Sequence, residues 1–142
     1  MRKLIFSMIF MLMPLAAAFA QDVTGKWKLD DGSAIVEVYK SGSAYNGKIV
    51  WLQNPTEADG TPAVDNQNPD PALRKREVLG LNMLSGLKET GRNEYSGGTI
   101  YDPGNGKTYN CSMKVEGDIL RVRGSLDKKG LIGRTMDWYR VK

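Results

Sequence analysis

Apolar and polar residues alternate with a period of two through most of the chain after residue 20, and this alternation restricts the fold more than any other feature. Over residues 107–115, for example, Tyr109, Cys111 and Met113 share one face. Turn sequences rich in Gly, Asp, Asn and Pro separate the alternating segments. The pattern predicts eight short strands, over residues 25–29, 33–40, 45–53, 78–87, 94–101, 107–115, 119–126 and 133–141.

Short strands with short connections avoid exposed sheet edges most completely when the sheet closes on itself. We therefore predict an all-β fold, an antiparallel eight-stranded up-and-down barrel, with a two-sheet β-sandwich as the alternative. A barrel of this size is either filled by side chains or holds one small ligand. One long loop, over residues 54–71, interrupts the rhythm, and Asp70 and Pro71 predict a short helical turn that continues to Arg76.

Residues 1–20 have the three parts of a secretory signal peptide. A basic start is followed by an apolar run over residues 4–15, and Ala18 and Ala20 are small residues at the positions that signal peptidase reads. We predict cleavage after Ala20, export to the periplasm or the medium, and a single domain over residues 21–142. An uncleaved anchor helix is the alternative, but the apolar run is short for a membrane span. No Cys follows the cleavage site, so we expect no stable membrane anchor.

Histidine does not occur in the sequence, which excludes Ser-His-Asp and Cys-His nucleophile arrangements and zinc sites that need imidazole. We expect no metal site, no cofactor and no enzymatic activity, with an enzyme that uses Asp65, Asp70 or Asp102 as a less favoured alternative. Without the predicted signal peptide the formal net charge of +4 falls to +2, because Arg2 and Lys3 are its only charged residues. This charge is too small to indicate binding to nucleic acid.

Cys111 is the only cysteine in the sequence, so no internal disulfide can form. Its alternating neighbours Tyr109 and Met113 place it on an apolar face. We predict a buried and unreactive thiol, with a reactive or intermolecular thiol as the alternative.

Arg74 and Arg76 follow the long loop, at a position that we expect near one mouth of the barrel. Guanidinium groups recognise carboxylate or phosphate in a fixed fork, so this pair predicts a clamp for an anionic group. Trp51, Tyr101 and Trp138 are the aromatic residues that we expect to line the ligand. The alternative is that the arginines are solvated helix charges and that the tryptophans are plain core residues.

Trp27 lies in the first predicted strand and Arg140 in the last. Because these strands are neighbours in a closed barrel, we expect the Arg140 guanidinium to stack on the Trp27 indole and to bond to the chain end. This pair is predicted to close the barrel and is not part of the ligand site.

Several segments carry a resemblance to a known family: GKIVWL at residues 47–52, NPDPALRKR at 68–76, GTIYDP at 98–103 with GKTY at 106–109, and GRT at 133–135 with WYRV at 138–141. Through them the chain resembles an exported bacterial family known as domain of unknown function 2147. The start Gly25-Lys26-Trp27 is also similar to the G-x-W opening of lipocalins. The resemblance implies a small, exported, lipocalin-like barrel with no settled activity. Many members of the family look as if they carry a Cys pair where Ser41 and Asn46 stand here, so a disulfide is not carried over.

From these residues and this resemblance we expect an exported protein that binds a small, partly apolar molecule. If Arg74 and Arg76 take part in binding, this molecule also carries an anionic group. This amphiphilic ligand would enter at the mouth near the long loop and present its acid group to Arg74 or Arg76. The alternative is an interaction module or inhibitor with a filled barrel, whose contact surface would be the loop over residues 54–71. The ligand and the oligomeric state stay open.

Overall fold

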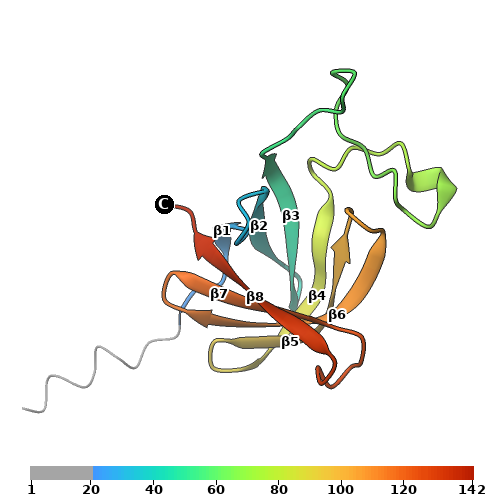
Figure 1. Ribbon diagram of the computed structural model, residues 1–142. Helices are drawn as coiled ribbons and strands as arrows, with labels where there is room; N and C mark the ends of the chain where they lie inside the picture. Colours follow the sequence, from blue (N-terminus) through green and yellow to red (C-terminus); the bar gives the residue numbers. More distant parts are fainter. Residues whose placement is uncertain (1–20) are drawn as a thin grey trace, which may run out of the picture.

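The computed structural model describes residues 21–142, which form a closed barrel of antiparallel strands in the order of the chain (Figure 1). Pairing of β1 with β8 closes the sheet on itself. The prediction of an antiparallel eight-stranded barrel is confirmed, and the sandwich is excluded. The predicted signal peptide lies outside the described residues. The strands are β1 (Gly25–Lys28), β2 (Ala34–Ser41), β3 (Ala44–Leu52), β4 (Asn82–Gly91), β5 (Glu94–Asp102), β6 (Lys107–Glu116), β7 (Ile119–Ser125) and β8 (Gly133–Arg140).

The connections alternate between the two ends of the barrel (Figure 1). One end, here called the terminal end, holds residues 21 and 142 and the tight β2–β3, β4–β5 and β6–β7 turns. The other, the loop end, gathers the β1–β2, β5–β6 and β7–β8 connections and the long loop between β3 and β4. The barrel mouth near the long loop, where the ligand was expected to enter, is therefore at the loop end.

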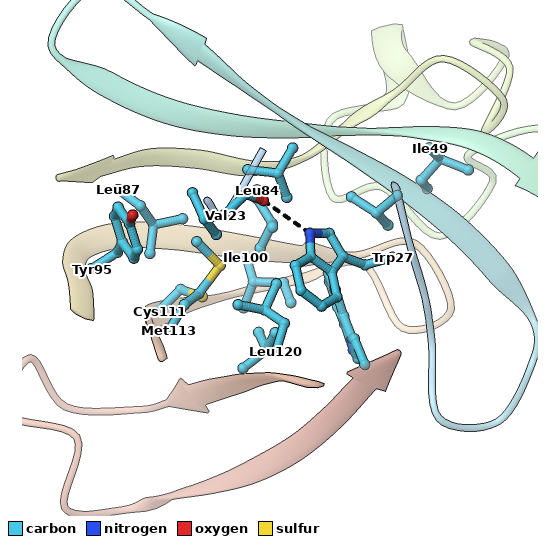
Figure 2. Packing of buried hydrophobic residues seen from close by; sticks show 14 of the residues in the cluster. Val23, Trp27, Ile49, Leu84, Leu87, Tyr95, Ile100, Cys111, Met113 and Leu120 are labelled. Atoms are coloured by element: carbon cyan, nitrogen blue, oxygen red, sulfur yellow. Dashed lines mark hydrogen bonds between the residues drawn. The ribbon is translucent and has the colours of Figure 1, made fainter. Parts of the chain in front are cut away.

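The N-terminal segment ties together two turns at the terminal end. The backbone N–H of Gln21 donates to Oδ1 of Asn93 in the β4–β5 turn (2.8 Å), and the N–H of Gly117 in the β6–β7 turn donates to Oε1 of Gln21 (2.7 Å). Val23 follows and is buried, and its carbonyl oxygen accepts a hydrogen bond from Nε1 of Trp27 (2.9 Å; Figure 2). These contacts cover the terminal end of the core.

Inward-facing side chains pack the body of the barrel (Figure 2). Trp27 from β1 and Trp138 from β8 are both fully buried. β4 and β5 approach each other so closely that a Cβ atom at Gly98 would collide with the carbonyl oxygen of Ser85. The core cluster consists of Val23, Trp27, Ala34, Val36, Val38, Ile49, Val78, Leu84, Leu87, Tyr95, Ile100, Cys111, Met113, Val115, Leu120, Val122 and Trp138.

The contact that was expected between the first and last strands is present. The guanidinium carbon of Arg140 lies 4.2 Å from the centroid of the Trp27 ring. Nη2 of Arg140 donates to the carbonyl oxygen of Asp22 (2.9 Å), and Nη1 donates to that of Thr24 (3.5 Å). One arginine of β8 therefore holds both the first core residue of β1 and the segment that precedes it.

The start of β4 differs from the prediction. The strand was expected from residue 78, but it begins at Asn82 and runs to Gly91. Residues 78–81 form a turn instead, in which the Leu81 N–H donates to the Val78 carbonyl oxygen (3.1 Å). Gly80 has a φ of 91°, a backbone conformation that Gly adopts without strain and that interrupts a strand.

The helical turn after the long loop is shorter than predicted. It is a 3-10 turn over Pro71–Leu73 and does not continue to Arg76. Its predicted cap is confirmed, because the Asp70 side chain accepts a hydrogen bond from the Ala72 N–H (3.0 Å). Among residues 21–142, the structure has no helix with the length and apolar character that a membrane span requires.

Candidate functional site

Asp65, in the long loop, is a carboxylate that is fully buried. It accepts hydrogen bonds from the Tyr101 hydroxyl (2.6 Å), Nδ2 of Asn68 (2.9 Å) and Nε of Arg76 (2.9 Å). Burial acts to raise the pKa of Asp65, but these donors outweigh it and hold the pKa below its ordinary value. Tyr101 follows the inward-facing Ile100, so this network fastens the long loop to the outer face of β5.

Both arginines of the predicted anion clamp take part in this network. Nε of Arg74 donates to the carbonyl oxygen of Asn68 (2.7 Å), and the guanidinium of Arg76 lies 5.7 Å from the Tyr101 ring centroid. In the described chain the hydrogen bonds of both arginine side chains use Nε, which leaves the Nη atoms to solvent or to a ligand. The structure thus brings Arg74, Arg76 and Tyr101 together, but outside the barrel wall.

Trp51 lies on the outer surface of the barrel. It is 40% exposed, and Nζ of Lys28 lies 5.1 Å from its ring centroid. The expectation that Trp51 lines an interior ligand is therefore wrong in its geometry. Strict alternation puts Trp51 on the same inward side as Ile49, but a β-bulge lies between the two residues. The residue added by the bulge turns Trp51 outward, opposite Ile35 of β2.

Trp138 faces inward, as expected, but it is packed in the core rather than beside an open space. It lies opposite Leu120 of β7, and both side chains are fully buried. Its Nε1 has no hydrogen-bond partner among the described residues. Trp51, Trp138 and the arginine network occupy three separate places, so the residues that were predicted to bind a ligand do not form one site.

At the loop end, four inward-facing apolar side chains keep partial exposure to solvent: Leu29, Leu52, Tyr109 and Met136. Leu29, Tyr109 and Met136 each lie two residues from a buried core residue, which is Trp27, Cys111 or Trp138. Leu52 pairs with Ala34, the buried residue of β2 that is nearest the loop end. We call this set the mouth. The sequence analysis missed it. Alternation puts Leu29, Tyr109 and Met136 on the inward side but does not show that solvent reaches them, and the bulge between Ile49 and Trp51 hides the inward position of Leu52.

A positive charge stands at the rim of the mouth. Arg134 is exposed at the start of β8 and continues the inward series of Met136 and Trp138. It pairs with Gly124 of β7. A Cβ atom at Gly124 would touch Tyr109, which shows that this register position faces the interior. The mouth therefore combines an apolar lining with one guanidinium.

The carboxylates that were considered for catalysis, and the Cys111 thiol, have other roles in the fold. Residues 21–142 contain no group of three or more His, Cys, Asp or Glu side chains that could hold a metal ion. The carboxylates of Asp70 and Asp102 accept backbone N–H groups of Ala72 (3.0 Å) and Gly104 (2.8 Å). Cys111 is buried, and burial raises the pKa of its thiol to about 12.

The comparisons with known proteins agree with this architecture. Residues 25–140 match a family described as an uncharacterized protein conserved in bacteria, DUF2147. Among solved structures, the chain is similar to protein HP1028 from the human pathogen Helicobacter pylori, which is described as belonging to the lipocalin family. The two chains are 26% identical with a TM-score of 0.76, over 85% of this chain and 84% of that chain. No curated protein matches the sequence. The chain thus belongs to the DUF2147 family and has a lipocalin-like barrel fold.

Proposed function

We propose that the protein binds a small, partly apolar molecule at the loop end of the barrel. The mouth carries this proposal, because its apolar side chains face inward and are still reached by solvent. Ligand sites are typically concave and apolar, with a few polar groups that orient the ligand. The body of the barrel is packed by side chains such as Trp27 and Trp138. The ligand therefore occupies the mouth and not the depth of the barrel.

The proposed ligand carries an acid group. Arg134 stands at the rim, next to Met136 on the same face of β8, and is the favoured contact for that group. Arg74 and Arg76 have free Nη atoms but lie outside the wall, beside Tyr101. They are the contacts only for a ligand that extends over the rim. The two possibilities differ in which arginine substitutions weaken binding.

We further propose that the protein is exported and that it acts by binding and not by catalysis. Residues 1–20 have the features of a signal peptide, which supports export of a domain over residues 21–142. The carboxylates that an enzyme could use are engaged in the fold, since Asp65 lies in the loop network and Asp70 and Asp102 cap turns. These engagements favour a binding protein over an enzyme.

Titration with a fatty acid and with the alcohol of equal chain length, followed by calorimetry, tests the proposal. We expect the acid to bind, and Arg134→Gln to weaken it about 10- to 100-fold, the effect of losing one hydrogen bond to a charged group. The same substitution should leave the alcohol unaffected. Arg121→Gln is the control, because Arg121 is an exposed arginine that pairs with Glu116 on the outer wall.

The outcome separates the alternatives. A loss in Arg74→Gln/Arg76→Gln, with Arg134→Gln unchanged, would move the acid group to the loop network. Equal affinity in all variants would remove these arginines from the site. No binding of either amphiphile would contradict the proposal.

The second candidate function is an interaction module, which the filled body of the barrel favours. Its contact surface would be the long loop, which Asp65 and Tyr101 hold in place through their hydrogen bond. Native mass spectrometry of protein purified from its own cells distinguishes the two. A co-purified small molecule supports the ligand-binding function, and a ligand-free mass together with absent amphiphile binding supports the module.

A further inference from the structure

The connection between β7 and β8 presents three large aliphatic side chains to solvent. Leu126, Leu131 and Ile132 are 71%, 77% and 63% exposed. We call residues 126–132 the hairpin tip, and it lies at the loop end, at the lower right of Figure 1. Soluble proteins rarely gather exposed aliphatic side chains in one place unless that place makes contact with something else.

The hairpin tip is held in a defined conformation by its own hydrogen bonds. The two carboxylate oxygens of Asp127 accept the backbone N–H groups of Leu131 (2.9 Å) and Ile132 (2.8 Å). The Leu126 N–H donates to the Ile132 carbonyl oxygen (2.8 Å), and Nε of Arg123 donates to that of Gly130 (2.7 Å). The aliphatic side chains are therefore displayed by an ordered loop, and little entropy is lost when they bind.

The charge balance of the hairpin tip is positive. Lys128 and Lys129 are exposed at its turn and outnumber its one carboxylate, Asp127, whose oxygens accept the backbone N–H groups of Leu131 and Ile132. A groove of about 390 Å³ lies beside the tip on the outer wall, and both lysines line it together with Ser112 and Asn110. Ammonium, hydroxyl and amide groups in one groove suit a phosphate group. Aliphatic side chains next to such a groove suit the acyl chains that phosphate carries in a phospholipid.

We propose that the hairpin tip binds the surface of a bilayer that contains anionic phospholipid. Leu126, Leu131 and Ile132 insert at the level of the acyl chains, and Lys128 and Lys129 contact lipid phosphates. An apolar patch alone would suit a protein partner equally well. The two lysines, which outnumber the one carboxylate of the tip, favour an anionic lipid surface, because interfacial binding combines apolar insertion with basic residues. The contact is peripheral and independent of the ligand proposed for the mouth.

Sedimentation with vesicles tests this contact on the protein without residues 1–20. We expect binding to phosphatidylcholine vesicles that contain phosphatidylglycerol, and much weaker binding to pure phosphatidylcholine. Lys128→Gln/Lys129→Gln should weaken binding about 30-fold at low salt. Each lysine near an anionic surface increases the affinity by a similar factor, and the double variant loses both contributions. Leu131→Ser/Ile132→Ser should weaken it at least about 100-fold, because two aliphatic side chains no longer enter the bilayer.

Matched variants control for charge and apolar surface in general. Leu73→Ser/Leu79→Ser removes two exposed leucines from the segment between the long loop and β4, and Lys26→Gln/Lys88→Gln removes two exposed lysines from the wall. Both should bind vesicles as the parent does, and circular dichroism melts should show that all variants fold.

Several results would overturn the proposal. The first is a parent protein that does not bind phosphatidylglycerol vesicles. The second is an equal loss in the tip variants and in their controls. The third is full displacement by soluble glycerophosphate together with unchanged binding of Leu131→Ser/Ile132→Ser, which would make the groove a site for a free anion. A dimer in solution that the same variant abolishes, without vesicle binding, would assign the tip to contact between two copies.

Discussion

Replacing Trp27 by alanine perturbs the core at the seam where the barrel closes. The side chain is fully buried, its Nε1–H donates to the Val23 carbonyl oxygen, and Arg140 stacks on its ring at 4.2 Å. Removal of the indole leaves a cavity, an unpaired buried carbonyl and a guanidinium without its aromatic partner. Truncation of a buried Trp costs about 3–5 kcal/mol. We expect Trp27→Ala to lie in the upper part of this range, because the polar losses add to the cavity.

Urea unfolding followed by far-ultraviolet circular dichroism measures the effect. With a denaturant dependence of about 1.5–2 kcal/mol per molar, the midpoint should fall by roughly 2–3 M. Trp27→Phe keeps an aromatic ring beneath Arg140 but loses the indole hydrogen bond and some volume, and should cost about 1–2 kcal/mol. Trp51→Ala removes a ring from the outer surface and should cost less than about 1 kcal/mol.

The losses of stability in Trp27→Ala and Trp51→Ala should differ by several fold, because only Trp27 is buried in the core. If Trp27→Ala loses less than about 1 kcal/mol, Trp27 is not a closing residue of the core. If Trp51→Ala is as damaging as Trp27→Ala, the β-bulge that turns Trp51 outward is not part of the fold in solution.

Three other properties can be measured independently. The pKa of Asp65 is lower in the folded protein than its ordinary value of 3.8, so its stabilising contribution is complete above that value and is lost as the pH falls through the folded pKa. Asp65→Asn should remove this acid dependence and accelerate amide hydrogen exchange over residues 54–77, and unchanged exchange would contradict the role of the network. Cys111, buried and with its thiol pKa raised to about 12, should react with a thiol reagent only as fast as the protein unfolds, whereas rapid labelling of the native protein would show an accessible thiol. The intact mass of the exported protein should be that of residues 21–142, and a mass that includes residues 1–20 would disprove cleavage after Ala20.

The strands could be predicted from the sequence because period-two alternation is a local property, and most strands here keep it without interruption. The predicted and observed bounds of β6, for example, differ by one residue. The prediction was wrong where the backbone departs from regular geometry. The bulge before Trp51 depends on how β3 pairs with β2, and alternation within β3 does not reveal it.

The candidate site was less predictable, because it depends on contacts between residues far apart in the chain. Tyr101 donates to Asp65 across 36 positions, and no local pattern links the two residues. Their position after the long loop pointed to Arg74 and Arg76, but the hydrogen-bond partners of these arginines place them outside the wall. The mouth was overlooked because an inward residue near the end of a strand has the same sequence pattern as a core residue.

The joining of β1 to β8 has a consequence for the order in which the chain acquires its structure. The hairpins from β2–β3 to β7–β8 connect strands that follow one another, so each can form as soon as its two strands exist. The seam instead unites Trp27 with Arg140, near opposite ends of the chain, and the pairing extends only to Lys28 and Tyr139. We expect this seam to be the last part of the barrel to form and the first to open. A chain still being synthesised would remain an open, curved sheet until its final strand arrives.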